Sequence, residues 1–68
     1  MQQLEAIRAP TLIIVGERDL PYYHEVADAL HRRIPNAAKV VMPGVGHMAN
    51  MEDPICFNKI VLDFLADQ

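Results

Sequence analysis

The run Thr11-Leu12-Ile13-Ile14-Val15 constrains the fold most strongly, because it is apolar and largely β-branched with no charged residue inside it. Pro10 precedes the run and Gly16 ends it. A strand with one face in water alternates apolar and polar residues, whereas an unbroken apolar run is typical of a strand covered on both faces within a parallel sheet. The sequence therefore predicts an α/β fold.

A helix is predicted between Tyr22 and Ile34, where apolar residues recur with helical spacing. Pro21 suits the first position of this helix, since proline there loses no needed hydrogen bond. Pro35 cannot continue the helix and marks its end. The pattern predicts an amphipathic helix of about three turns.

A second strand and a second helix complete the predicted order of strand, helix, strand and helix. Residues 38–42 (AKVVM) form a shorter apolar run, and its charged Lys39 indicates a place near the edge of the sheet. Asp53 is placed to cap a last helix that begins at Pro54. The apolar stripe of that helix comprises Phe57, Ile60, Val61, Phe64 and Leu65. This is a βαβα arrangement of two parallel strands and two main helices.

Length and composition limit the domain and its partners. A chain of 68 residues is at most one small domain, and a domain of this size buries only about 60% of its unfolded surface. Hydrophobic residues nevertheless make up 51% of the chain, which indicates surface that something else must cover. The net charge of -3, with no basic cluster beyond Arg32-Arg33, argues against nucleic-acid binding.

Cysteine content and hydropathy indicate a compartment. The single cysteine, Cys56, excludes an internal disulfide framework and a thiolate metal cage, so a reducing cytoplasm is the expected location. Residues 1–10 lack the basic and apolar regions of a signal peptide, and no apolar run approaches 18 residues. We therefore expect no membrane partner, and no motif for a cofactor is present.

Two loops carry the residues most suited to chemistry. Parallel strands joined by a helix place their carboxyl ends at one rim of the sheet, where open α/β sheets bind ligands. Asp19 lies in the loop after the first strand, and His47 ends the loop PGVGH after the second. A carboxylate that accepts a hydrogen bond from imidazole Nδ1–H leaves Nε2 free as a base. We therefore predict that Asp19 and His47 meet at this rim.

Simpler interpretations remain open for these residues. Asp19 could only shape the turn before Pro21, and His47 could be a loop histidine bonded to backbone. No nucleophile accompanies them: the chain has no serine, Thr11 begins a buried strand, and Cys56 is better explained as a small core residue.

Two further groups of residues have both a functional and a structural interpretation. His24, Asp28 and His31 share one helix face, as metal ligands would, but a solvated face explains them more simply and no metal site is expected. Methionines near the histidine could line a substrate pocket or fill the core; they are Met42, Met48 and Met51. Met48, directly after His47, is the candidate for substrate binding.

The segments APTLIIVGERD and AKVVMPGVGHMANMEDPICFNKIVLDFL together resemble the C-terminal end of the α/β-hydrolase fold. The resemblance is to serine hydrolases of the 3-oxoadipate enol-lactonase and meta-cleavage-product hydrolase type. It implies that Asp19 is the triad acid and His47 the triad histidine. The nucleophile elbow G-x-S-x-G and the oxyanion hole of the family are absent here. Residues 1–68 are thus expected to be a single partial domain, the last two strand-helix units of such a hydrolase.

Two functions follow as expectations. The first is a C-terminal part of a serine hydrolase for a carboxylic ester, lactone or carbon-carbon bond, inactive alone because the nucleophile is missing. The small-molecule substrate would bind once an N-terminal part completes the site. The alternative is a stand-alone non-catalytic α/β module that self-associates or docks on a partner chain. In either case the open edge of strand 11–15 favours a homo-oligomer of the isolated chain.

Overall fold

The computed structural model describes residues 4–67, in which two strands and four helical segments follow one another. In chain order these are the 3-10 helix η1 (Leu4–Ala6), β1 (Thr11–Gly16), α1 (Pro21–Arg33), β2 (Ala37–Met42), α2 (Ala49–Glu52) and α3 (Pro54–Ala66). The predicted order of strand, helix, strand and helix is confirmed. The two short segments η1 and α2 were not predicted, because neither is long enough to show helical periodicity.

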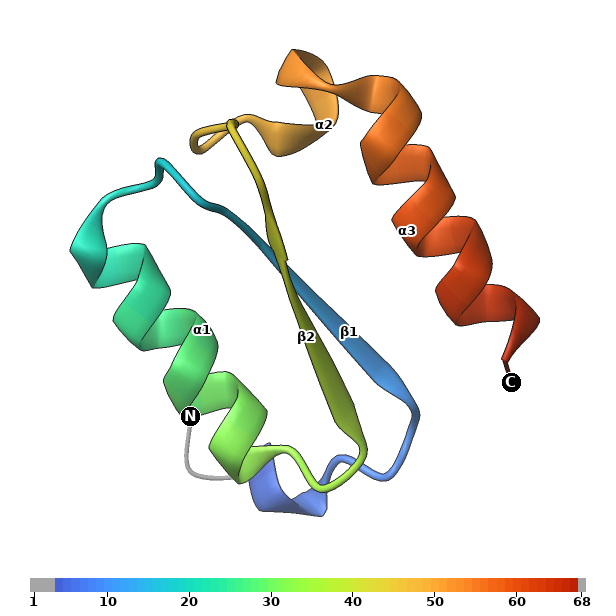
Figure 1. Ribbon diagram of the computed structural model, residues 1–68. Coiled ribbons are helices and arrows are strands. Elements are labelled where there is room, and N and C mark those ends of the chain that lie inside the picture. Colours follow the sequence, from blue (N-terminus) through green and yellow to red (C-terminus); the bar gives the residue numbers. More distant parts are fainter. Residues whose placement is uncertain (1–3, 68) are drawn as a thin grey trace.

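β1 and β2 are parallel and pair from Thr11 with Ala37 to Gly16 with Met42. The strands therefore end level with each other, and the loops that follow them leave the same rim. α1 lies against one face of this sheet and α3 lies beyond the other (Figure 1). This arrangement confirms the α/β fold class, although each strand includes one more residue than the sequence predicted.

The face of the sheet toward α1 holds the first part of the core. Ile13 and Val15 of β1 are buried together with Ala27 of α1, and Leu30 and Ala37 pack against them. Odd-numbered residues of β1 point to this face because successive strand residues alternate.

The opposite face holds a second apolar cluster at the carboxyl end of β2. Met42 is fully buried and packs with Val45 and Ala49, the first residue of α2. Partly buried apolar residues surround this cluster; they are Ile14, Cys56, Phe57 and Ile60. Both faces of β1 are therefore covered, as its unbroken apolar run predicted.

Prolines and one aspartate set the helix ends. α1 begins at Pro21 and its last turn closes when Ile34 N–H donates to the Leu30 carbonyl at 2.9 Å, directly before Pro35. Asp53 caps α3 by accepting a 3.1 Å hydrogen bond from Cys56 N–H, with Pro54 as the first helical residue. The predicted boundaries of both main helices are thus confirmed to within a residue or two.

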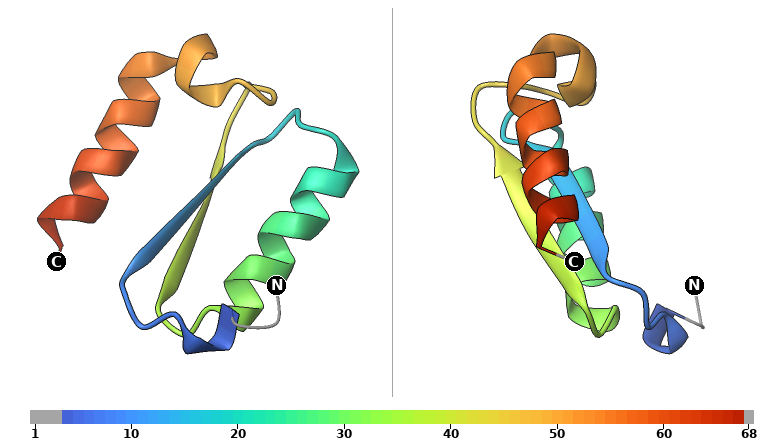
Figure 2. Two further views of the ribbon diagram at one scale, coloured as in Figure 1. Left: turned by 180° about the vertical axis from the view of Figure 1, so that it is seen from behind. Right: turned by 90° about the vertical axis from the view of Figure 1, so that its right-hand side faces the viewer.

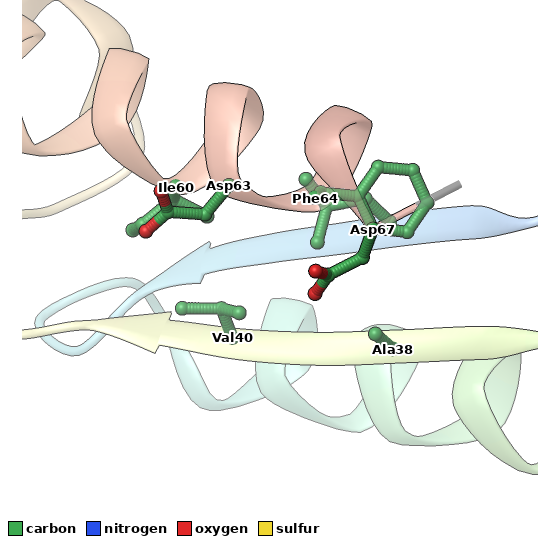
Figure 3. A pocket seen from close by; sticks show the side chains of 7 residues that line it. Ala38, Val40, Ile60, Asp63, Phe64 and Asp67 are labelled. Atoms are coloured by element: carbon green, nitrogen blue, oxygen red, sulfur yellow. The ribbon is translucent and has the colours of Figure 1, made fainter.

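α3 covers its face of the sheet only in part. No residue of α3 is buried, and Leu65 of the predicted apolar stripe is 59% exposed. An apolar pocket of about 260 Å³ separates α3 from the strands, with Ala38 and Val40 on one side and Ile60 and Phe64 on the other (Figure 3). The molecule is flat, with extents of 32 × 30 × 13 Å, as the edge-on view in Figure 2 shows.

None of the helices within residues 4–67 has the length and apolar character needed to cross a membrane.

Candidate active site

The loops after β1 and β2 run side by side at the rim of the sheet (Figure 1) and are joined by backbone hydrogen bonds. Glu17 N–H donates to the Met42 carbonyl at 2.8 Å, which extends the strand pairing by one residue. Arg18 N–H donates to the Val45 carbonyl, also at 2.8 Å. Since Asp19 and His47 lie on these two loops, the bonds place the two residues relative to each other.

A glycine at the end of β1 allows this close approach. A Cβ atom on Gly16 would lie 2.2 Å from the Gly46 carbonyl oxygen and 2.6 Å from that of Val45. Neither oxygen belongs to a flexible side chain, so any other residue would force the loops apart. In the second loop, Gly44 has φ of +74°, a conformation that glycine adopts without steric cost.

The carboxylates of Glu17 and Glu52 bind backbone N–H groups of the histidine loop. Glu17 Oε1 accepts a 2.8 Å hydrogen bond from Gly44 N–H. Glu52 accepts from Gly46 N–H with Oε1 at 3.1 Å and Oε2 at 3.2 Å. No motif in the sequence indicated the first contact. The position of a glutamate five residues after His47 was the only signal for the second.

Asp19 and His47 form the pair that the sequence predicted. His47 Nδ1 lies 3.1 Å from Asp19 Oδ2, while Asp19 Oδ1 accepts a 2.8 Å hydrogen bond from Leu20 N–H. The Asp19 side chain is only 7% exposed, whereas the His47 side chain is 61% exposed. The carboxylate is therefore shielded and the imidazole is presented to solvent.

The ionisation of Asp19 determines the roles of the imidazole nitrogens. Burial opposes ionisation, but hydrogen bonds from His47 and Leu20 N–H outweigh it, so the pKa of Asp19 lies below its ordinary value. An ionised carboxylate can only accept hydrogen bonds, so Nδ1 of His47 carries the proton. Nε2 then keeps a free lone pair and can act as a base.

Tyr23, in the first turn of α1, packs on the imidazole. The ring centroids of Tyr23 and His47 are 4.6 Å apart with an interplanar angle of 41°. The ring centroids of Tyr22 and Tyr23 are 5.2 Å apart in a T-shaped arrangement, and Tyr22 is 65% exposed. Sequence analysis did not identify this contact, because helical spacing alone does not show which side chain reaches a loop.

The possible metal stripe on α1 has other contacts. The His24 ring nitrogen Nε2 donates to the Glu17 carbonyl at 3.2 Å, since a carbonyl oxygen can only accept. Asp28 forms an ion pair with Lys39 of β2, and His31 is exposed. Across residues 4–67, no three His, Cys, Asp or Glu side chains gather as metal ligands would.

The methionines near the histidine differ in their surroundings. Met42 is fully buried in the core, which excludes it as a pocket residue, whereas Met48 is 49% exposed and Met51 is 69% exposed. The two alternative nucleophiles, Cys56 and Thr11, have structural contacts of their own. Cys56 is half-buried against the cluster around Met42, and the Thr11 hydroxyl donates to the Ala9 carbonyl at the opposite end of the sheet.

Comparison with known proteins gives three similarities. The model of the Abhydrolase_4 family, described as TAP-like protein, matches residues 1–68. "Putative carbamate hydrolase RutD" is 39% identical over 62 residues both in Escherichia coli O26:H11 (strain 11368 / EHEC) and in Escherichia coli (strain K12 / DH10B). Each alignment covers 91% of this chain and 23% of RutD.

A solved structure shares the fold. The structure of MenH from S. aureus superposes with a TM-score of 0.92 and 32% sequence identity, covering 97% of this chain and 24% of MenH. The chain therefore spans about a quarter of the length of the proteins it matches.

Proposed function

Because this chain belongs to the α/β-hydrolase family, we propose that it forms the C-terminal part of a serine hydrolase, with Asp19 and His47 as two members of the catalytic triad. The observation that carries the proposal is the 3.1 Å contact between His47 Nδ1 and Asp19 Oδ2 at the rim of the sheet. The alternative, a non-catalytic module, is less well supported because the chain matches the Abhydrolase_4 model and is similar to a carbamate hydrolase.

In this proposal His47 accepts and later returns one proton, and Asp19 stabilises the protonated imidazole. A serine hydroxyl would lose its proton to His47 Nε2 as its oxygen attacks the substrate carbonyl. The imidazolium formed in this step is stabilised by the ionised, shielded carboxylate of Asp19. His47 then returns the proton to the leaving group. The exposed imidazole and shielded acid suit these two roles.

The substrate class is an acyl compound, namely a carboxylic ester, a lactone or a ketone whose carbon-carbon bond is hydrolysed. The name of RutD extends this list to carbamates, which are cleaved at the same kind of carbonyl. Met48 follows His47 and is half exposed, so we assign it a place beside the bound substrate. The lone Cys56, which cannot form an internal disulfide, fits an enzyme of the reducing cytoplasm.

The nucleophile must come from outside these residues, because the chain contains no serine. The oxyanion hole of the family is formed by the backbone N–H of the residue after that serine and one from an earlier loop, so it is expected outside as well. A base without a nucleophile to activate gives no triad catalysis. Residues 1–68 alone are therefore expected to show no ester hydrolysis that depends on His47.

A chimera tests the proposal. Residues 1–68 would replace the matching 23% of Escherichia coli RutD, which is named as a carbamate hydrolase, and hydrolysis of 4-nitrophenyl esters would be measured. We expect turnover by the chimera and none by the 68-residue chain. His47→Ala or Asp19→Asn should lower kcat by about 10³-fold or more.

His31→Ala is the matched control, because His31 is an exposed histidine on α1. It should leave kcat within about twofold. Turnover by a folded chimera that survives His47→Ala would contradict the assigned role. Turnover by the 68-residue chain that is lost with His47→Ala would contradict the need for an external nucleophile.

We also propose that the isolated chain forms a dimer through the open edge of β1. Thr11 N–H donates to the Asn36 carbonyl and Glu17 N–H to that of Met42, so the N–H groups of odd-numbered β1 residues face β2. The backbone groups of Leu12 and Ile14 therefore point away from β2, where no third strand lies within residues 4–67. An unpaired strand edge is a template for a second copy.

Light scattering tests the dimer. The chain should have twice the mass of the monomer, and Leu12→Pro should shift it to monomer because proline removes an N–H from the open edge only. Ile13→Pro is the contrasting variant, since it removes an N–H that faces β2 and should unfold the chain. A dilute wild-type monomer that melts cooperatively would contradict this proposal.

A further inference from the structure

Two carboxylates from different elements hold the loop that ends at His47. We infer that Glu17 and Glu52 are positioning residues, which bind the N–H groups of Gly44 and Gly46 and so place the imidazole of His47 against Asp19. The inference rests on the proposed function only in that His47 is taken to be the base. The positioning itself is a property of the chain.

The loop needs such support because of its glycines. Gly44 and Gly46 flank Val45 and have more backbone freedom in an unrestrained loop than any other residue. Gly44 also holds a φ of +74°, which only local contacts select from the conformations open to glycine. Without such contacts the loop would sample conformations in which His47 does not reach Asp19.

Glu17 connects the two loops of the pair. Its side chain accepts from Gly44 N–H at 2.8 Å, and its own N–H donates to the Met42 carbonyl at 2.8 Å. Its carbonyl accepts from His24 of α1. Since Glu17 lies two residues before Asp19, one residue ties the loop of the acid to the loop of the base and to α1.

Glu52 acts from the other side of the histidine. It ends the short helix α2, and both of its carboxylate oxygens share the N–H of Gly46 at 3.1 and 3.2 Å. This contact closes the segment from 46 to 52 on itself, with His47 inside the closed segment.

The contacts of Glu17 and Glu52 hold different parts of the loop. Glu17 fixes the start of the loop relative to the acid, whereas Glu52 fixes the residue directly before His47. Between them, the Val45 carbonyl accepts from Arg18 N–H and the Val45 side chain is buried in the core. Each of the three loop residues before His47 is therefore held by a contact of its own.

NMR of the ¹⁵N-labelled 68-residue chain tests this inference without any need for turnover. Glu52→Ala should speed amide exchange of Gly46 by about tenfold, and Glu17→Ala should do so for Gly44. Exchange of Ile13, whose amide lies within β1, should change by less than about twofold. In both variants the ring-proton resonances of His47 should move toward random-coil values, because the imidazole leaves the face of Tyr23.

Glu5→Ala is the matched control. Glu5 belongs to η1, which lies at the opposite end of the sheet from the two loops (Figure 1), and it pairs with Arg33. This variant should leave the His47 resonances unchanged. In Glu52→Gln the His47 resonances should lie much closer to their wild-type positions than in Glu52→Ala, because the glutamine amide oxygen still accepts from Gly46 N–H. His47 resonances that stay in place in Glu52→Ala and Glu17→Ala would overturn the inference, even if both variants are less stable. This result is independent of whether the chimera hydrolyses esters.

Discussion

The rim of the sheet and the face under α3 are held together by different means. At the rim, two loops with mostly exposed residues are held by directional contacts: two backbone hydrogen bonds, two carboxylates on glycine N–H groups, and the Asp19–His47 pair. Under α3 the residues are mainly apolar, yet no residue of α3 is buried and a pocket of about 260 Å³ remains (Figure 3).

The difference shows what a chain of this size can and cannot build alone. Directional hydrogen bonds need only a few atoms in the right place, so a small segment can hold the geometry of Asp19 and His47. Apolar stabilisation grows with the area removed from water, and Ile55, Leu62 and Leu65 remain largely exposed. Substitutions at the rim should therefore disturb the site, and substitutions on the apolar side should reveal how little α3 contributes.

The largest effect is expected for Gly16→Ala. The new methyl group would lie 2.2 Å from the Gly46 carbonyl oxygen, which is backbone and cannot rotate away. We expect a loss of about 3 to 5 kcal/mol in the free energy of unfolding, which a domain this small cannot spare. Urea unfolding followed by circular dichroism measures it.

Gly46→Ala is the matched control for that variant. Its methyl group would meet only the Glu52 side chain, with the nearest oxygen at 3.3 Å, and this side chain can move. The free energy of unfolding should fall by about 1 kcal/mol or less. Equal losses in the two variants would mean that the contact between the loops is not what makes Gly16 necessary.

A smaller loss is expected for Met42→Ala, at the boundary between the two regions. Met42 is fully buried and joins the rim to the start of α3, so a cavity should cost about 2 to 3 kcal/mol. Ile55→Ala on α3 removes a side chain that is 84% exposed and should cost nearly nothing. A loss for Ile55→Ala that approaches the one for Met42→Ala would show that α3 is held more tightly than its exposure indicates.

The backbone architecture was predictable because local signals agree with the final fold. The run from 11 to 15 became β1, Pro21 and Pro35 bracket α1, and Asp53 caps α3. The segments that escaped prediction are those with no periodic signal, above all α2 with four residues. The apolar stripe of α3 was predicted, but its Leu65 is exposed because this chain supplies too little surface to cover it.

The pair at the centre of the site was predictable for a topological reason. Parallel strands of equal register put Asp19 and His47 at one rim, where a carboxylate can orient an imidazole. The supporting contacts were not predictable, since those of Glu17, Glu52 and Tyr23 depend on how each side chain leaves a turn. A sequence shows that a residue can bind an N–H group but not which one it reaches.

Tyr23→Leu tests the aromatic contact at the rim. Loss of the aromatic contact with His47 should cost about 1 kcal/mol of stability and move the ring-proton resonances of the imidazole. Tyr23→Phe keeps the ring and should leave those resonances nearly unchanged. Proton NMR of the three proteins measures the effect, and identical His47 resonances in Tyr23→Leu would show that the two rings do not pack in solution.

Acidification should weaken the rim through Asp19. Its pKa is lower in the folded chain than in the unfolded chain, so the unfolded state binds protons first as the pH falls. The stabilisation is therefore complete above about pH 4 and is lost as the pH drops through the folded pKa. Glu5, next to Arg33, and Asp28, next to Lys39, act in the same direction, because the pKa of each is lowered by a hydrogen bond from its partner.

The variant Asp19→Asn shows how much of the stability lost on acidification comes from Asp19. The difference in urea midpoint between about pH 6 and about pH 3 should be smaller in this variant than in the wild type. An unchanged difference would mean that Asp19 has the same pKa in both states.

The smallest effect is expected for Lys59→Ala, at an exposed position of α3. Lys59 and Asp63 form an ion pair at 2.7 Å, but both side chains are largely exposed, at 75% and 66%. Water and salt screen such a pair, so its attraction is nearly offset by the cost of ordering two long side chains. Lys39→Ala should lower the urea midpoint more, because Lys39 is only 22% exposed and its ion pair with Asp28 joins β2 to α1. If Lys59→Ala were the more damaging of the two, local pairs on α3 would matter more than contacts between elements, and the loose packing of α3 would not be the weak point of this chain.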